Sequence, residues 1–145
     1  MADGLAPVGA WVAVTGKITW EVFVLGAGVG LWIAGFDVIY AFMDITVDRA
    51  QRLHSIPADL GENAGLWSTR LFHLLAVALL AVTGYILGTN FVYYLGVAAC
   101  ALLLFYENWL MRKVDLARVG VAFMTMNGII SVVFLFFTTI SLFVP

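Results

Sequence analysis

Three aspartates and a tyrosine lie on one side of a single apolar segment, and they are the residues best suited to chemistry. At about 100° per residue of α-helix, Asp44 lies about 20° to one side of Asp37 and Asp48 about 20° to the other. Tyr40 lies about 60° from Asp37. A carboxylate near the centre of a bilayer costs roughly 2.5–3.5 kcal/mol, and neighbouring carboxylates repel one another. Such a stripe indicates a bound cation, a water-filled cavity or a basic partner.

The residues around this stripe form an extended motif. Residues 37–48 read D-x-x-Y-A-x-x-D-x-x-x-D, and residues 53–61 read L-H-S-I-P-A-x-x-G. The motif resembles the second Asp-rich motif of the UbiA superfamily, the intramembrane aromatic prenyltransferases. The variant at residues 53–57 is similar to 4-hydroxybenzoate-polyprenyltransferase-like members assigned to menaquinone synthesis, whereas many ubiquinone-pathway members carry a lysine where His54 stands. The resemblance covers the second half of the family's pattern and continues through Tyr106-Glu107 and Asn127-Gly128.

The resemblance implies catalytic and metal-binding roles for the aspartates. Asp44 and Asp48, one turn apart, would hold one Mg²⁺ directly or through waters. Asp37 would orient the ligands and waters around the metal, or a basic partner. The metal would neutralise the pyrophosphate that leaves an allylic polyprenyl diphosphate. Tyr40 would line the cavity with its ring toward the carbocation. The alternative, that the aspartates solvate a helix end, explains Asp37 poorly because it lies about 10 Å further along the axis.

Four further residues are candidates for binding substrate. Arg49 and Arg52 are suited to contact diphosphate, although basic residues that anchor a loop on one side of the membrane explain them equally. His54 can donate to a phosphate or act as a base, and a solvated loop histidine is the alternative. Asn127 lies about ten residues into the last apolar segment, where polar side chains usually bond across helices and where substrate contact is the other interpretation.

Two more polar residues fall inside apolar segments. We expect His73 to be buried and hydrogen-bonded, because it lies about one turn into a span. For Glu107 we expect an ion pair with Arg112, and contact with an aromatic substrate is the alternative.

Composition places these residues in a membrane. The 145 residues are 63% hydrophobic and 11% charged, with a mean hydropathy of +1.04, which is typical of a multi-span membrane protein. The net charge of −2 and the lack of a basic tract give no indication of nucleic-acid binding. We expect one all-α transmembrane domain over residues 1–145, a bundle of four full spans plus a leading half-span. The expected spans are residues 20–44, 66–88, 91–111 and 117–144, and the half-span is residues 5–14.

A polar loop follows the first full span. Residues 45–70 contain proline and glycine punctuation and are expected to form a helical loop over the end of that span. Ser55 is expected to cap a short helix with Pro57 and Asp59 in its first turn. Six of the seven basic residues lie in this loop or in the next loop on the same side, and Lys17 alone lies opposite. The positive-inside rule therefore orients the Asp-rich loop toward the cytoplasm, in a bacterial inner membrane.

Several features indicate that the sequence corresponds to only half of the family's pattern. Residues 5–14 would extend about 15 Å, roughly half of a hydrocarbon core. The first Asp-rich motif that the resemblance implies, N-D-x-x-D-x-x-x-D, is absent from the sequence. Gly26, Gly30 and Ala34 recur every four residues and are expected to pack against a missing N-terminal half. The isolated chain would then be inactive, with that half, the lipid bilayer, a polyprenyl diphosphate and an aromatic acid acceptor (hydroxynaphthoate or 4-hydroxybenzoate) as its partners.

A non-enzymatic function is the alternative from a different class. The chain would then be a small carboxylate-bearing carrier, a helical subunit that packs through its glycine face, or an inactive truncated product of a prenyltransferase gene. Homodimerisation that rebuilds two facing Asp motifs is a further possibility. An in-frame continuation upstream of Met1, with more spans and the first Asp-rich motif, would identify the chain as part of a larger enzyme.

Overall fold

The computed structural model describes residues 2–111 and 119–145, and all regular structure in them is helical. Four helices are long and apolar enough to cross a membrane: α2 (Trp20–Met43), α5 (Glu62–Ile86), α6 (Phe91–Leu110) and α7 (Val119–Ser141). The short elements are η1 (Ala2–Leu5), α1 (Ala6–Thr15), α3 (Ile45–Gln51) and α4 (Ile56–Leu60). The expected all-α bundle of four spans with a short leading apolar helix is confirmed, while the second basic loop, with Arg112, lies outside the described residues.

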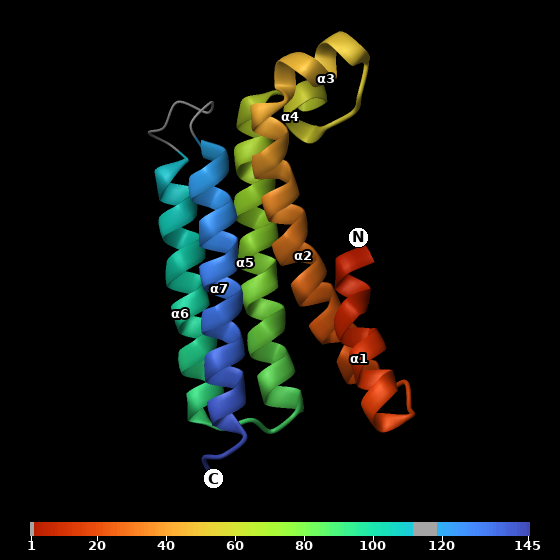
Figure 1. Ribbon diagram of the computed structural model, residues 1–145, viewed down its shortest axis with the longest axis vertical. Coiled ribbons are helices and arrows are strands. Elements are labelled where there is room, and N and C mark those ends of the chain that lie inside the picture. Colours follow the sequence, from red (N-terminus) through yellow and green to blue (C-terminus); the bar gives the residue numbers. More distant parts are fainter. Residues whose placement is uncertain (1, 112–118) are drawn as a thin grey trace.

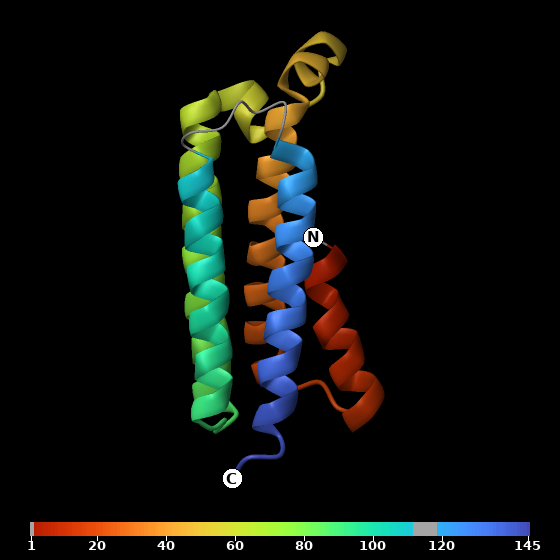
Figure 2. The same ribbon diagram turned by 60° about the vertical axis from the view of Figure 1, so that its left-hand side comes forward.

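The four long helices stand side by side in one bundle (Figure 1). α2 packs along α5, α5 along α6, and α6 along α7, while α2 also meets α7 and carries α1 on its outer side (Figure 2). α3 and α4 lie at one end of the bundle. Asn90 organises the opposite end: its Oδ1 accepts from the Val92 N–H at 3.0 Å and caps α6, and its Nδ2 donates to the Ser141 carbonyl at 2.8 Å. The C-terminal end is thereby tied to the α5–α6 turn.

All four spans contribute to one apolar core. Phe36, Ala76, Leu104 and Ile130, one from each long helix, are at most 3% exposed and belong to the same packed cluster. The outer faces of the bundle carry large, exposed apolar side chains, among them Leu102, which is 70% exposed. Apolar residues on both the inner and the outer faces are expected for helices whose outer solvent is lipid.

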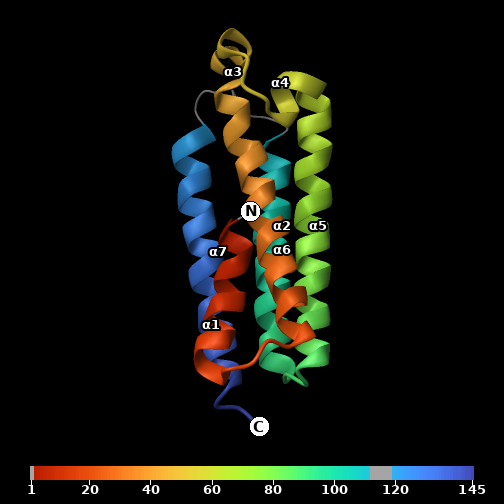
Figure 3. The same cartoon turned by 90° about the vertical axis from the view of Figure 1, so that its right-hand side faces the viewer.

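The small residues of α2 pack against the chain's own N-terminal segment. A Cβ at Gly26 would lie 2.7 Å from the Gly4 carbonyl oxygen and 3.1 Å from Val8, and a Cβ at Gly30 would lie 3.6 Å from the Gly4 Cα. In Figure 3, η1 and α1 fold back along the lower part of α2. The prediction that Gly26 and Gly30 face a missing half is therefore wrong, because the close approach that small residues permit is used within this chain.

The two ends of the bundle support a topology prediction. Asp48 lies in α3 at one end and Val144 follows α7 at the other (Figure 1). We expect the Asp-rich loop to face the cytoplasm. A membrane-impermeant maleimide should therefore label Asp48→Cys in inside-out vesicles and Val144→Cys in right-side-out vesicles. Cys100, which is buried, would be replaced by serine to remove background. Labelling of both positions from one side would contradict this topology.

Candidate functional site

The helix that carries Asp37 ends at the second aspartate of the motif. Asp44 has φ −104° and ψ 5°, which interrupts helical geometry between α2 and α3. The Asp48 N–H donates to the Asp44 carbonyl oxygen over 2.7 Å, so Asp44 opens the first turn of α3. Asp37 therefore lies on α2, Asp44 at the junction and Asp48 on α3. The predicted stripe on one continuous helix is wrong, because periodicity alone does not reveal a change of axis at Asp44.

Asp37 and Asp44 are exposed, the first within α2 and the second at its C-cap, and the other charged residue of α2 is Glu21 in its first turn. By helical periodicity Asp37 lies about 20° from Gly30, on the face of α2 that the N-terminal segment covers further down. In Figure 3 that segment follows only the lower part of α2. The two carboxylates therefore open onto the uncovered part of this face, next to the α3–α4 end of the bundle.

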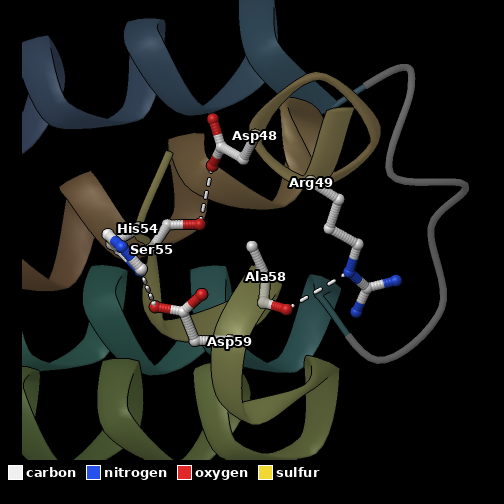
Figure 4. A network of polar contacts seen from close by, with 6 residues as sticks. All are labelled: Asp48, Arg49, His54, Ser55, Ala58 and Asp59. Atoms are coloured by element: carbon white, nitrogen blue, oxygen red, sulfur yellow. Dashed lines mark hydrogen bonds and ion pairs between the residues drawn. The ribbon is translucent and has the colours of Figure 1, made fainter. Parts of the chain in front are cut away.

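Two side-chain hydrogen bonds connect α3 to the segment that begins α4 (Figure 4). The Ser55 Oγ donates to the Asp48 Oδ2 over 2.6 Å. The Arg49 Nε donates to the Ala58 carbonyl oxygen over 3.2 Å. These contacts, on successive residues of α3, fix the half-buried Asp48 carboxylate relative to α4.

Ser55 and His54 form the polar loop between α3 and α4. Ser55 occupies the N-cap position of α4, with Pro57 and Asp59 in the first turn, as predicted. The predicted side-chain cap is wrong, because the Ser55 hydroxyl is committed to Asp48. The His54 side chain is 88% exposed, and its Nδ1 lies 3.0 Å from the Asp59 Oδ2 (Figure 4). His54 is thus held at the surface by a carboxylate of α4.

The two arginines of α3 are exposed. Arg52 ends the helix with a left-handed backbone, φ 55°. In Figure 4 the Arg49 side chain extends away from the Asp48 carboxylate. Within the described ranges neither guanidinium forms an ion pair. Both cations are therefore available to an anion at this end of the bundle.

Tyr40 and Asn127 take no part in the hydrogen bonds between α3 and the segment that begins α4. Tyr40 is half-buried and packs against the main core cluster. Asn127 lies on α7, is half-buried, and its backbone carbonyl accepts from the Ser131 Oγ at 2.9 Å. The structure therefore brings Asp48, Ser55 and α4 together, and carries Asn127 on a separate helix.

The donors at the α2–α3 junction are the type that Mg²⁺ prefers. Across the part of the chain that the structure describes, no group of three or more His, Cys, Asp and Glu side chains is close enough to hold a metal. Mg²⁺, however, usually binds through one or two carboxylates together with waters and substrate phosphates. Asp44 is exposed and Asp48 is held in place by Ser55, so these two residues fit such an ion, with Asp37 nearby on α2.

A polar pair, the buried His73 and the half-buried Asn108, joins α5 to α6. The Asn108 Nδ2 donates to the Leu104 carbonyl at 2.8 Å and lies 2.9 Å from the His73 Nδ1. Because the amide nitrogen is the donor, His73 Nδ1 accepts and the proton of the neutral ring resides on Nε2. His73 is 3% exposed, so the predicted buried, hydrogen-bonded histidine is confirmed. Asn108 was not predicted as a partner, although an amide in an apolar span is itself a signal for a bond between helices.

Glu107 is buried beside this pair. Its side chain is 1% exposed, and neither carboxylate oxygen has a hydrogen-bond partner within the described residues. Its predicted partner, Arg112, lies outside those residues. Ion pairing of Glu107 therefore stays a prediction.

Gly35 lets the His73 ring approach α2. A Cβ at Gly35 would overlap the ring. We expect Gly35→Ala to lower the free energy of unfolding by about 1–3 kcal/mol, the usual cost of overpacking. Gly128→Ala is the matched control, because it is also a helical glycine and a Cβ there meets nothing within 4 Å. Unfolding in detergent would measure both variants, and equal stabilities would contradict the packing of His73 on Gly35.

Comparisons with known proteins show which family the chain belongs to. The model of the UbiA prenyltransferase family matches residues 1–142. A 4-hydroxybenzoate solanesyltransferase from Synechocystis sp. is 30% identical over 117 residues, which are 81% of this chain and 38% of that protein. A 4-hydroxybenzoate octaprenyltransferase from Nitrosococcus oceani is 31% identical over 133 residues, 92% of this chain and 46% of that protein. No solved structure matches.

The family match covers nearly the whole chain, from η1 to the last turn of α7. The chain spans less than half the length of these two relatives. The names of both relatives describe the transfer of a polyprenyl group to 4-hydroxybenzoate. This chain, with its exposed carboxylates at the α2–α3 junction, belongs to the UbiA prenyltransferase family.

Proposed function

We propose that this chain supplies the second Asp-rich site of an intramembrane aromatic polyprenyltransferase. The observation that carries the proposal is the pair of exposed carboxylates, Asp37 and Asp44, on an apolar span that adjoins a third carboxylate, Asp48, fixed by Ser55. Carboxylates within an apolar span cost free energy and are therefore usually kept for a function. The exposure of these carboxylates supports a role in binding a metal and diphosphate.

The chain's own residues divide this work among them. Asp44 and Asp48 provide carboxylate oxygens, and the Ser55 hydroxyl orients Asp48. Bound Mg²⁺ would supply positive charge to the diphosphate as the allylic carbon–oxygen bond breaks. Arg49, Arg52 and His54 line the same end of the bundle, where their donors can reach phosphate oxygens.

Three further residues act around the metal, the reacting carbon and the acceptor. Asp37 positions the waters or basic groups next to the metal. The ring of Tyr40 faces the allylic carbocation, which an apolar cavity protects from water. Asn127 contributes from α7, where its amide is suited to hold a polar group of the aromatic acceptor.

The acceptor is proposed to be an aromatic acid of quinone biosynthesis. The relatives' names support 4-hydroxybenzoate, whereas the variant at residues 53–57 resembles members of the menaquinone branch and supports a hydroxynaphthoate. Membranes that contain this chain together with an N-terminal half would be given radiolabelled polyprenyl diphosphate and either 4-hydroxybenzoate or 1,4-dihydroxy-6-naphthoate. We expect Mg²⁺-dependent product with one of the two acceptors, and no product with either would contradict the proposed reaction.

The number of Asp-rich motifs supports a shared active site. Residues 1–145 contain one such motif, and the stretches that match the two relatives correspond to 38% and 46% of those proteins. We propose that the other half of the diphosphate site comes from a polypeptide with the first motif. The non-enzymatic alternative of a subunit that docks through its glycine face loses support, because η1 already covers Gly26 and Gly30.

A further inference from the structure

A groove runs along the seam between α5 and α6. It has a volume of about 370 Å³, at the lower end of the roughly 300–1,000 Å³ typical of small-molecule pockets. Most of its lining is apolar, including Leu74 and Val77 from α5 and Phe105 from α6. The groove is therefore suited to hold a hydrocarbon chain.

The groove opens sideways, away from the aspartates. His73 touches Gly35 of α2 on one side, and at about 100° per residue Leu74 turns away from that contact. Leu74 is 67% exposed and Phe105 is 71% exposed. Because α5 and α6 are membrane-spanning helices, the mouth of the groove faces the acyl chains of the bilayer.

One positive charge lies at the groove. The Asn108 amide donates to the His73 Nδ1 and to the Leu104 carbonyl, so these polar atoms are paired within the seam. Arg70 lies with its guanidinium carbon 5.1 Å from the centre of the Trp67 ring, a contact that leaves the charge uncompensated. Arg70 has no ion pair among the residues that the structure describes.

Arg70 lies near one end of a membrane-spanning helix, from where its long side chain can extend to the lipid headgroups. It follows Glu62, the first residue of α5, by eight residues, or about 12 Å, at the end of the bundle that carries α3 and α4. Trp67 and Trp109 flank it, and tryptophan is enriched at membrane interfaces. On the cytoplasmic side, where positive residues are expected, anionic phospholipids provide the local negative charge.

We infer that this groove binds one anionic phospholipid, with its phosphate against Arg70 and an acyl chain along Leu74, Val77 and Phe105. The charge of Arg70 complements a phosphate, and the lateral opening admits a lipid directly from the bilayer. A prenyl diphosphate is a poorer fit, because the carboxylates suited to its metal lie on α2, outside the lining of the groove. The site is independent of the proposed transferase reaction.

The test uses the 145-residue chain in nanodiscs that contain brominated phosphatidylglycerol or brominated phosphatidylcholine. Bromine quenches nearby tryptophan fluorescence, and Trp109 lines the groove. We expect a preference for phosphatidylglycerol that Arg70→Gln reduces roughly fivefold, the effect of one basic residue at an anionic surface. Arg52→Gln is the matched control, since it removes the same charge at the same end but outside the groove, and should keep the preference.

A second variant tests the apolar part of the site. Ala101→Phe fills the groove and should reduce quenching by both lipids, while Arg70→Gln affects only the anionic lipid. Equal losses for Arg70→Gln and Arg52→Gln would show only general surface attraction and would overturn the site. Displacement of phosphatidylglycerol by a short prenyl diphosphate at lower concentration would also overturn it, in favour of a substrate site.

Discussion

Asp44→Asn should lower prenyl transfer about 10²–10³-fold in the assembled enzyme, the range found when one group that stabilises developing charge is removed. Asp44 is exposed at the α2–α3 junction, so the substitution removes a charged metal ligand without disturbing the core. Asp48→Asn should have a similar effect and also weaken the acceptor for the Ser55 hydroxyl. Asp37→Asn should be damaging as well. Radiolabelled prenyl transfer in membranes, with and without EDTA, measures all three.

Asp59→Asn is the control for these variants. It removes the same charge from the same end of the bundle, but from α4, where Asp59 pairs with His54. It should lower turnover far less than Asp44→Asn. Full activity of Asp44→Asn, or activity that does not respond to EDTA, would rule out the metal role assigned to this junction.

Residues 1–145 alone should give no turnover above background, whereas co-expression with an N-terminal half should restore it. The physical reason is charge: diphosphate binding through metals from two sides needs carboxylates from two motifs. The chain supplies one such motif. The assay would use the isolated chain and the paired sample at equal expression, with both aromatic acceptors.

The isolated chain has a second possible outcome in this experiment. A homodimer with two facing Asp-rich motifs would give turnover that rises with the square of the chain's concentration in the membrane. Turnover by the lone chain comparable to that of the paired sample would defeat the argument that the site is shared.

Hydropathy predicted the spans because length and composition determine which segments cross a bilayer. The ends of α5 differ from expectation: it begins at Glu62, whereas the predicted span began at residue 66. Residues 62–65, which were expected in the polar loop, are part of this helix. A membrane-spanning helix can extend into the interface with its backbone hydrogen bonds intact. The short gap expected between residues 88 and 91 corresponds to the turn between α5 and α6, where Asn90 is the N-cap of α6.

The site was predicted less completely, because it depends on contacts between elements. Periodicity placed Asp37 and Asp44 on one side of a helix, but the break at Asp44 depends on how α3 packs on α4. The small-residue pattern identified a close-packing face, yet a pattern does not reveal that Gly4 covers it. Likewise, the pairing of His73 with Asn108 joins residues from two helices, and a single sequence holds no signal for which pair will meet.

The most direct test of the central claim is metal binding at the α2–α3 junction. Mn²⁺ would replace Mg²⁺ in the paired halves, and electron paramagnetic resonance would measure its binding with a non-reactive prenyl diphosphate analogue. The structure predicts Mn²⁺ binding that requires the analogue and that falls by roughly 10–100-fold when Ser55→Ala removes the group that orients Asp48. Replacement of both Asp44 and Asp48 by asparagine should abolish the Mn²⁺ binding that these two residues provide. Unchanged binding in that double variant would contradict the assignment of the metal site to this junction.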